Sequence, residues 1–236
     1  MRFEFKFALN PSQFTQMKSW LDYTATLDPY LNGHEDYPVL SQYLDTPSLD
    51  FFYLKIEGEF QHVKLRLRAY RDYFSDSETV FVEAKIKYEQ SQKKIRIPIL
   101  HGEFPQLLAR SDLPTEFTPV MEAFFELDLR PIINIYYRRR PYVYFEDGVE
   151  LRLNFDSTAL YLYPFENRVM PNHSVQRLIF PADQPYLLEV KTPINYCPAE
   201  LQNMLRSIDA KLVRYSKYAL GVQAMDKINN YQEVNL

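Results

Sequence analysis

The chain has 236 residues, of which 46% are hydrophobic and 16% aromatic, and this length is enough to bury one sizeable core. Its net charge of −4 argues against a general nucleic-acid-binding surface, so nucleic acid is not an expected partner. Its single cysteine excludes an internal disulfide, and its five glycines leave no glycine-rich phosphate loop. Any phosphate bound here must therefore be held by side chains.

The start of the chain and its hydropathy predict no export and no membrane insertion. The first residues, Met-Arg-Phe-Glu-Phe-Lys, alternate like a strand instead of forming a signal peptide. No apolar run approaches the roughly 20 residues that span a bilayer. With the lone cysteine, these features predict a cytoplasmic protein, and because no linker interrupts the sequence, we expect a single domain over residues 1–236.

Strand and helix patterns follow one another along the whole chain. Asn10 followed by Pro11 is a typical helix start, and Glu146-Asp147-Gly148 predicts a turn between two strands. Strands are predicted over residues 2–8, 39–44, 60–70, 79–88, 93–100, 131–139, 141–145, 150–156 and 187–192, with a loop over 24–37. Helices are predicted behind Asn10, from Thr46-Pro47, over 103–110 and 119–127, from Pro198 through Ile208, and over about 215–227, while residues 160–183 follow no clear pattern.

Charged residues recur at every second position on at least six of these strands. Side chains two positions apart share one face of a strand, so such residues lie together. In the longest case, Lys64, Arg66 and Arg68 alternate with apolar residues. The pattern recurs as Glu4 with Lys6, Glu83 with Lys85 and Lys87, Lys94 with Arg96, Glu150 with Arg152, and Glu189 with Lys191, and Arg139 ends another strand.

Two interpretations of this pattern are open. For any one strand, the usual explanation is a solvated sheet face with cross-strand ion pairs. For the whole chain, several amphipathic helices also need an apolar surface to cover. The combination predicts an α+β fold in which about eight antiparallel strands form a closed β-barrel, with the charged face lining a tunnel and the helices packed outside.

A tunnel lined by so many cations would have to hold water and a polyanion, because buried unpaired charges are prohibitively costly. Arg and Lys are the residues that bind phosphate oxygens. The accompanying glutamates suit Mg²⁺ or Mn²⁺ ions that bridge carboxylate and phosphate oxygens.

Nine segments carry a family resemblance and span nearly the whole chain. In order they are RFEFKF, YLDTPSLDFFYLK, KLRLRAY, VFVEAK, KKIRIP, RPIINIYYRRRPY, LRLNFD, LLEVK and RYSKYALG. In this order they resemble the vacuolar transporter chaperone (VTC) domain, which belongs to the triphosphate tunnel metalloenzymes. The resemblance implies a polyphosphate polymerase that transfers the γ-phosphate of ATP to a growing polyphosphate chain, with Mn²⁺ or Mg²⁺ as cofactor.

The resemblance also implies which residues do this work. The active-site residues would be Lys6, Arg66, Arg68, Lys85, Arg139, Arg152 and Lys217. Further phosphate-binding residues would be Lys64, Lys94, Arg96, Lys191 and Arg138, although the sequence leaves open which of Arg138, Arg139 and Arg140 enters the tunnel. The metal ligand would be Glu189, with Glu4 and Glu83 as weaker candidates.

Two other functions stay open at this stage. The same tunnel could hydrolyse triphosphate or nucleoside triphosphates, because water would only replace the phosphate acceptor. A non-catalytic polyanion-binding module is the other alternative, in which the glutamates pair with lysines and bind no metal. Relatives carry an inositol-phosphate-sensing module and membrane spans that this sequence lacks, which leaves association with a separate membrane protein, at the inner face of a membrane, open.

Several residues outside the alternating pattern are also of types that can form functional sites. The histidines His34, His62, His101 and His173 lie at unrelated spacings and do not predict a zinc site. Cys197 has no paired histidine motif that would make it a nucleophile. For Tyr43 and Asp45, ligand contact and helix capping are both open, as are ligand contact and a solvated face for Lys211 and Arg214.

Overall fold

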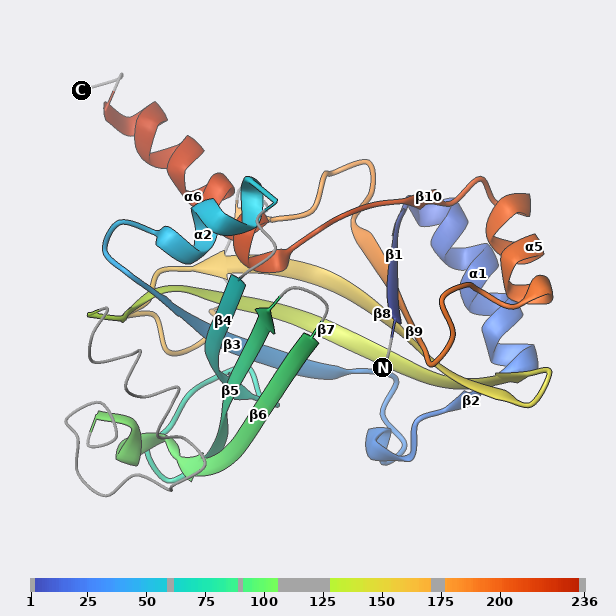
Figure 1. Ribbon diagram of the computed structural model, residues 1–236, viewed down its shortest axis with the longest axis horizontal. Helices are drawn as coiled ribbons and strands as arrows, with labels where there is room; N and C mark the ends of the chain where they lie inside the picture. The colour runs from blue at the N-terminus through green and yellow to red at the C-terminus, as the bar shows by residue number, and fades with distance from the viewer. Residues whose placement is uncertain (1–2, 59–61, 89–90, 106–127, 171–176, 234–236) are drawn as a thin grey trace. The chain divides into compact units, whose positions relative to one another are not determined.

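The computed structural model describes residues 3–58, 62–88, 91–105, 128–170 and 177–233 (Figure 1). Contacts divide the chain into two compact units. Unit 1 comprises Met1–Pro38, Tyr137–Ala159 and Leu178–Ser216, and unit 2 comprises Val39–Tyr136, Leu160–Arg177 and Lys217–Leu236. Each unit is described by itself, and the expected single domain over 1–236 stays a prediction.

Each unit combines strands with helices. Unit 1 holds β1 (Phe3–Leu9), α1 (Pro11–Thr24), β2 (Thr26–Leu27), η1 (Pro29–Leu31), β9 (Tyr186–Thr192), α5 (Ala199–Ser207) and β10 (Lys211–Leu212). Unit 2 holds most of β3 (Tyr37–Asp45), with α2 (Asp50–Ile56), β4 (His62–Ala69), β5 (Thr79–Tyr88), β6 (Ser91–Leu100), η2 (His101–Glu103) and α6 (Lys217–Glu233). The long strands β7 (Arg130–Glu146) and β8 (Val149–Leu162) each contribute residues to both units.

The strands form an antiparallel sheet that is not closed. Its hydrogen-bonded order is β10-β1-β9-β8-β7-β3-β4-β5-β6, and β2 pairs with β7. The α+β class is confirmed, but the expectation of a closed barrel of about eight strands is wrong, because this ten-stranded order has two ends. One end strand, β10, has only two residues, so it offers almost no edge to which another strand could add.

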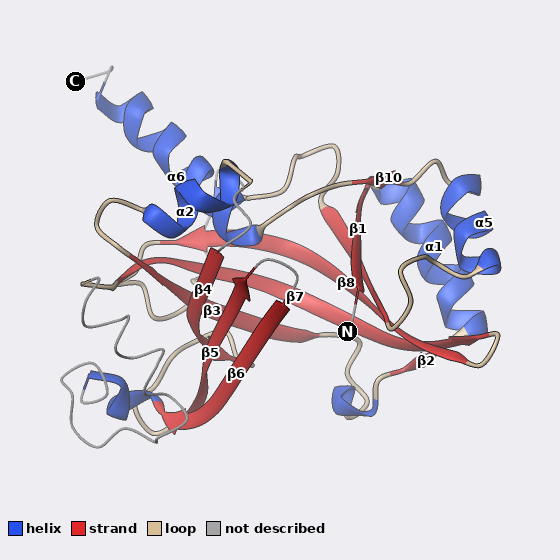
Figure 2. Cartoon of the chain, viewed as in Figure 1, coloured by secondary structure: helices blue, strands red, loops and turns tan. Residues whose placement is uncertain are grey.

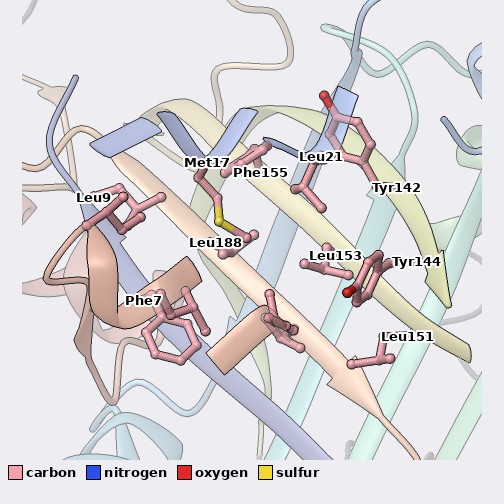
Figure 3. Packing of buried hydrophobic residues seen from close by; sticks show 14 residues of the cluster. Phe7, Leu9, Met17, Leu21, Tyr142, Tyr144, Leu151, Leu153, Phe155 and Leu188 are labelled. Atoms are coloured by element: carbon pink, nitrogen blue, oxygen red, sulfur yellow. The ribbon is translucent and has the colours of Figure 1, made fainter. Parts of the chain in front are cut away.

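Unit 1 buries one apolar face of its strands against α1 and α5. Figure 3 shows Met17 and Leu21 of α1 packed with Phe155 and Leu188 of the sheet. Helix α1 begins as the sequence predicts, since the Asn10 side chain accepts a hydrogen bond from the Gln13 N–H, and the Gln13 side chain accepts one from the Asn10 N–H. In this unit the helices therefore cover the apolar face of the strands, as expected.

Strands β7 and β8 form a hairpin with a two-residue loop. Asp147 and Gly148 both have positive φ, 50° and 76°, as a type I′ turn requires. The sequence predicted two strands separated near Pro141, but β7 runs through this residue without a break. Pro141 has no N–H to donate, but its carbonyl still accepts a hydrogen bond from the Asp28 N–H (3.2 Å), so the residue keeps one of its two backbone pairings.

In unit 2, the strands β4, β5 and β6 are neighbours (Figure 2). Residues along these strands alternate in burial. Leu65 and Leu67 are buried, whereas the intervening Arg66 keeps a partly exposed side chain. Helix α2 begins at Asp50 rather than at Thr46, because Leu49 adopts a left-handed conformation with φ of 60°. Helix α6 comes very close to β7, since a Cβ atom on Gly221 would lie 2.4 Å from the Cδ1 of Ile135.

The remaining predictions concern short elements and segments outside the described residues. The predicted loop over 24–37 also contains the short elements β2 and η1. The predicted helix over 119–127 and most of the one over 103–110 lie outside the described residues, as does His173. Within the ranges that the structure covers, no helix is both long and apolar enough to cross a membrane.

Candidate phosphate-binding faces

The first candidate site is one face of β4, β5 and β6 in unit 2. Register places Lys64 opposite Lys85 and Lys85 opposite Lys94, so three ammonium groups lie in one cross-strand row. Like charges directly opposite each other destabilise a sheet unless an anion compensates them. We call this surface the basic face, and it comprises Lys64, Arg66, Arg68, Lys85, Lys94 and Arg96 with one carboxylate, Glu83.

Glu83 lies among the three guanidinium groups of this face. Its Oε2 lies 2.7 Å from the Nη2 of Arg66 and 3.7 Å from the Nη1 of Arg68, and its Oε1 lies 3.3 Å from the Nε of Arg96. Burial opposes ionisation of the Glu83 carboxyl, but the charges of Arg66 and Arg68 outweigh it and lower the pKa to about 2. Glu83 therefore holds the arginines in place.

Tyr43 of β3 extends the basic face. Its hydroxyl accepts a hydrogen bond from Nη1 of Arg66 (2.9 Å), and its ring stacks on Tyr218 of α6 with centroids 5.1 Å apart. Burial raises the pKa of the Tyr43 phenol, but the charges of Arg66, Arg68 and Lys217 lower it by more. Lys217 thus belongs to the same electrostatic environment. Because Tyr43 and Arg66 pair across the strands, α6 begins on the charged side of β3, contrary to the expectation that all helices cover the apolar side.

Asp45, two residues along β3, has a structural role. Its carboxylate accepts hydrogen bonds from the backbone N–H groups of Thr46, Phe51 and Phe52 at 2.7–2.9 Å, and from the Tyr218 hydroxyl at 2.5 Å. These contacts cap α2 and link it to α6, so the capping alternative holds for Asp45.

The second candidate site is the face of unit 1 opposite its helices. Arg139 of β7 forms a two-pronged ion pair with Asp156 of β8 (2.6 and 2.7 Å), and its Nη2 also contacts Oε2 of Glu189 on β9 (2.8 Å). Burial disfavours the Arg139 charge, but Asp156 raises its pKa well above the usual value. We call this surface the mixed-charge face, and it comprises Glu4, Lys6, Arg139, Glu150, Arg152, Asp156, Glu189 and Lys191.

The lysines of the mixed-charge face lie beside its carboxylates. Register places Lys6 opposite Glu189 and Glu4 opposite Lys191. Nζ of Lys6 lies 3.0 Å from the Glu4 carboxylate and donates a hydrogen bond to the Tyr215 carbonyl (2.9 Å). Burial and the charge of nearby Arg139 lower the pKa of Lys191 to about 8, against the opposing charge of Glu189, whose Oε2 lies 3.8 Å away.

The three consecutive arginines of β7 separate by strand alternation. Only Arg139 points to the mixed-charge face; Arg138 pairs with Asp36, and Arg140 lies 3.3 Å from Asp22 of α1. Arg152 shares the face but is more exposed, and lies 3.6 Å from Glu150. Arg139 is therefore the arginine of this run that lies with the other candidate site residues of unit 1.

The three predicted metal ligands differ in their surroundings. Glu83 does not fit a metal site, because guanidinium groups surround its carboxylate. Burial and the charge of Glu189 raise the pKa of Glu4, but Lys6 and Lys191 lower it by more, so the Glu4 carboxylate is stabilised in its charged form. Among the residues that the structure describes, no three His, Cys, Asp or Glu residues form a metal-binding group. Mg²⁺ commonly needs only one or two carboxylates when substrate phosphates complete its ligands, and Glu4 with Glu189 fits that arrangement.

The structure thus sorts the predicted residues into two sets, one in each unit. The expectation that both sets line one cavity stays a prediction.

Two residues of these faces, Asp156 and Ser41, were not predicted from the sequence. Asp156 lies two residues beyond Asn154 in the quoted segment LRLNFD, and its alternation with Arg152 was a usable signal. Ser41, which accepts a hydrogen bond from Nε of Arg68 (3.2 Å), had no such signal.

Comparisons with curated proteins and with solved structures bear on the fold of this chain. No curated protein matches the chain. Among solved structures, a protein from Bacillus halodurans (bh2851), described as a "putative adenylate cyclase", is 14% identical over 92% of this chain and 94% of that chain, with a TM-score of 0.51. The PH1819 protein from Pyrococcus horikoshii OT3 is also 14% identical, over 94% and 99% of the two chains, with a TM-score of 0.48. At this identity, the likeness to the first protein concerns the fold alone.

The decisive match is to a family. The VTC domain matches residues 1–226, which is nearly the whole chain and contains both charged faces. This match confirms the resemblance that the nine sequence segments indicated. The chain therefore belongs to the VTC domain family.

Proposed function

We propose that this protein is a polyphosphate polymerase that transfers the γ-phosphate of ATP to the end of a polyphosphate chain in a metal-dependent reaction. The observation that carries the proposal is the basic face, where six cationic side chains on three adjacent strands surround one carboxylate. Such a density of cationic side chains on one face suits a polyanionic ligand. Membership of the VTC domain family supports the same conclusion.

The dimensions of the basic face suit a chain of phosphates. Lys64, Arg66 and Arg68 extend for about 13 Å along β4, at roughly 3.3 Å per residue. Lys64, Lys85 and Lys94, which we call the lysine row, lie opposite one another on β4, β5 and β6, so the row extends the cationic surface across two further strands. Several consecutive phosphates can therefore contact this surface at once, whereas the transfer of one phosphoryl group alone would require fewer contacts.

The reaction itself needs positioning and charge neutralisation more than acid-base chemistry. A terminal oxygen of the chain forms a bond to the γ-phosphorus, and the bond from that phosphorus to the β,γ-bridging oxygen breaks, so ADP leaves with the electron pair. Arg66 and Arg68 are held by Glu83 in a fixed orientation suited to equatorial phosphate oxygens. Glu4 and Glu189 would hold a Mg²⁺ or Mn²⁺ ion, which supplies neutralisation of phosphate charge when bound.

Product analysis tests this proposal. With ATP and Mn²⁺, the protein should yield ADP and chains that a gel resolves, with little free orthophosphate. The double variant Lys85→Gln with Lys94→Gln should form fewer and shorter chains, because it removes two cations from the lysine row. An Arg206→Gln control, at an exposed position on α5, should leave the products unchanged, because α5 covers the face of the strands opposite the charged one.

Two other outcomes would each contradict the polymerase. Stoichiometric release of orthophosphate without chains would identify a triphosphatase of the same fold. Salt-sensitive binding of ATP or polyphosphate without any product would identify a polyanion-binding module.

A further inference from the structure

Arg96 on the basic face has surroundings that a phosphate-binding arginine does not need. Its Cζ lies 3.8 Å from the centroid of the Phe81 ring, so the guanidinium group stacks on that ring. Its Nη2 donates a hydrogen bond to the Tyr70 hydroxyl (3.0 Å), and its Nε lies 3.3 Å from Oε1 of Glu83. The Tyr70 ring in turn meets Phe81 edge-on, with centroids 5.8 Å apart.

These contacts fix the plane of the guanidinium group and engage part of its edge. Partners on the nitrogens do not by themselves distinguish Arg96, because all three nitrogens of Arg66 also have partners. The ring contact does, since the Cζ of Arg66 lies 5.7 Å from the centroid of the Tyr43 ring, against 3.8 Å for Arg96 and Phe81. Phe81 covers one face of the group, while the Arg96 side chain remains 38% exposed. A fixed, exposed guanidinium plane is suited to stack on another planar π-system, as arginines do with nucleobases.

The position of Arg96 relative to the lysine row agrees with a nucleotide. Lys94 lies two residues before Arg96 on β6, which places the two side chains roughly 7 Å apart along the same face. Arg66 and Glu83 lie in the same cross-strand row as Arg96. A nucleotide has its base and its phosphates on opposite sides of one ribose, so a base on Arg96 would direct the phosphates toward the lysine row.

We propose that Arg96, supported by Phe81 and Tyr70, is a nucleobase platform that selects a nucleoside triphosphate over inorganic tripolyphosphate. The inference rests on the proposed function in that it takes the rest of the basic face as the phosphate-binding surface. It gives Arg96 a role different from that of Arg66 and Arg68, although all three contact Glu83.

Paired binding measurements test the platform. The affinities of ATP and of inorganic tripolyphosphate are measured by calorimetry for the unaltered protein and for Arg96→Lys. Lysine keeps the charge but has no planar group, so the affinity for ATP should fall about tenfold, within the range for one base stack, while that for tripolyphosphate changes less than about twofold. Phe81→Leu, which removes the supporting ring, should show the same selective loss. Lys94→Gln is the matched control and should weaken both ligands equally.

The outcomes separate the two proposals. An equal loss of ATP and tripolyphosphate affinity in Arg96→Lys and in Phe81→Leu would overturn the platform and leave the polyphosphate-binding face intact. Unchanged ATP affinity in both variants would also overturn it. If the unaltered protein binds neither ligand, the proposed function fails and the platform fails with it.

Discussion

The basic face of unit 2 and the mixed-charge face of unit 1 use the same strand pattern but differ in charge balance. On β4, β5 and β6, six cationic residues accompany one carboxylate. On β1, β7, β8 and β9, four cationic residues accompany four carboxylates. The first arrangement has an excess of cationic side chains, which suits an anionic ligand, whereas the second has equal numbers of both charges, which suits a cation as well.

The two buried glutamates show what this difference means. Glu83 and Glu189 are 4% and 5% exposed, and both contact arginine. Glu83 is surrounded by guanidinium groups, whereas Glu189 shares Arg139 with Asp156 and lies on the same face as Glu4. The same residue type at the same burial is thus a structural anion in one unit and a candidate metal ligand in the other.

The largest expected effect separates these two glutamates. In Glu189→Gln, the affinity for Mn²⁺ measured with tripolyphosphate bound, and the rate of chain synthesis, should both fall by about two orders of magnitude or more. Folding should survive, because Asp156 still pairs with Arg139. In the matched variant Glu83→Gln, Mn²⁺ affinity should stay near that of the unaltered protein. Equal losses in the two variants, or full activity in Glu189→Gln, would remove the distinction between the faces.

A smaller effect is expected for the lysine row. Lys85→Gln should lower tripolyphosphate affinity about tenfold and raise the free energy of unfolding of the ligand-free protein by about 0.5 kcal/mol, because it relieves repulsion from Lys64 and Lys94. The control Arg152→Gln removes a cation that is 53% exposed and lies beside Glu150, so it should give no gain in stability. Denaturant unfolding and calorimetry measure both quantities. A lower free energy of unfolding in Lys85→Gln would contradict the predicted repulsion among the three lysines.

The smallest effect concerns pH and the mixed-charge face. The pKa of Lys191 is lowered from 10.5 to about 8. Anion binding favours the charged lysine, so as the pH rises above 8 the tripolyphosphate affinity of the unaltered protein should fall several-fold relative to that of Lys191→Arg, in which the titration of the ligand itself is the same. Lys191→Arg should remove this step, because arginine stays protonated. A step of equal size in the variant would assign the titration to another group.

The same pKa shift predicts a change in stability of opposite sign. The unfolded chain binds the Lys191 proton more tightly than the folded protein does, since its pKa is the higher of the two. Lys191 therefore destabilises the ligand-free fold below pH 8, and this cost is relieved between pH 8 and about 10.5. Comparing the pH dependence of unfolding with that of Lys191→Arg isolates the contribution.

The local features of this protein were readable from its sequence. Alternation along a strand depends only on neighbours two positions apart, so the common face of Lys64, Arg66 and Arg68 could be predicted without a fold. The helix start at Asn10 and the turn at Asp147-Gly148 also depend on a few adjacent residues. The family resemblance, confirmed by the match over residues 1–226, was carried by such short segments.

Tertiary structure decided what each charged residue meets. Glu83 and Glu189 are alike in sequence, each followed two residues later by a lysine, yet the sheet gives them different partners. Glu83 meets arginines of the two strands next to it in the chain, whereas Glu189 meets Arg139 of the distant strand β7. Strand order left the sheet open where the alternation suggested closure. Tertiary packing also decided that Arg139, and not Arg138 or Arg140, lies on the mixed-charge face. The physical reason is that register and cross-strand neighbours are set by long-range pairing and core packing, which no local pattern specifies.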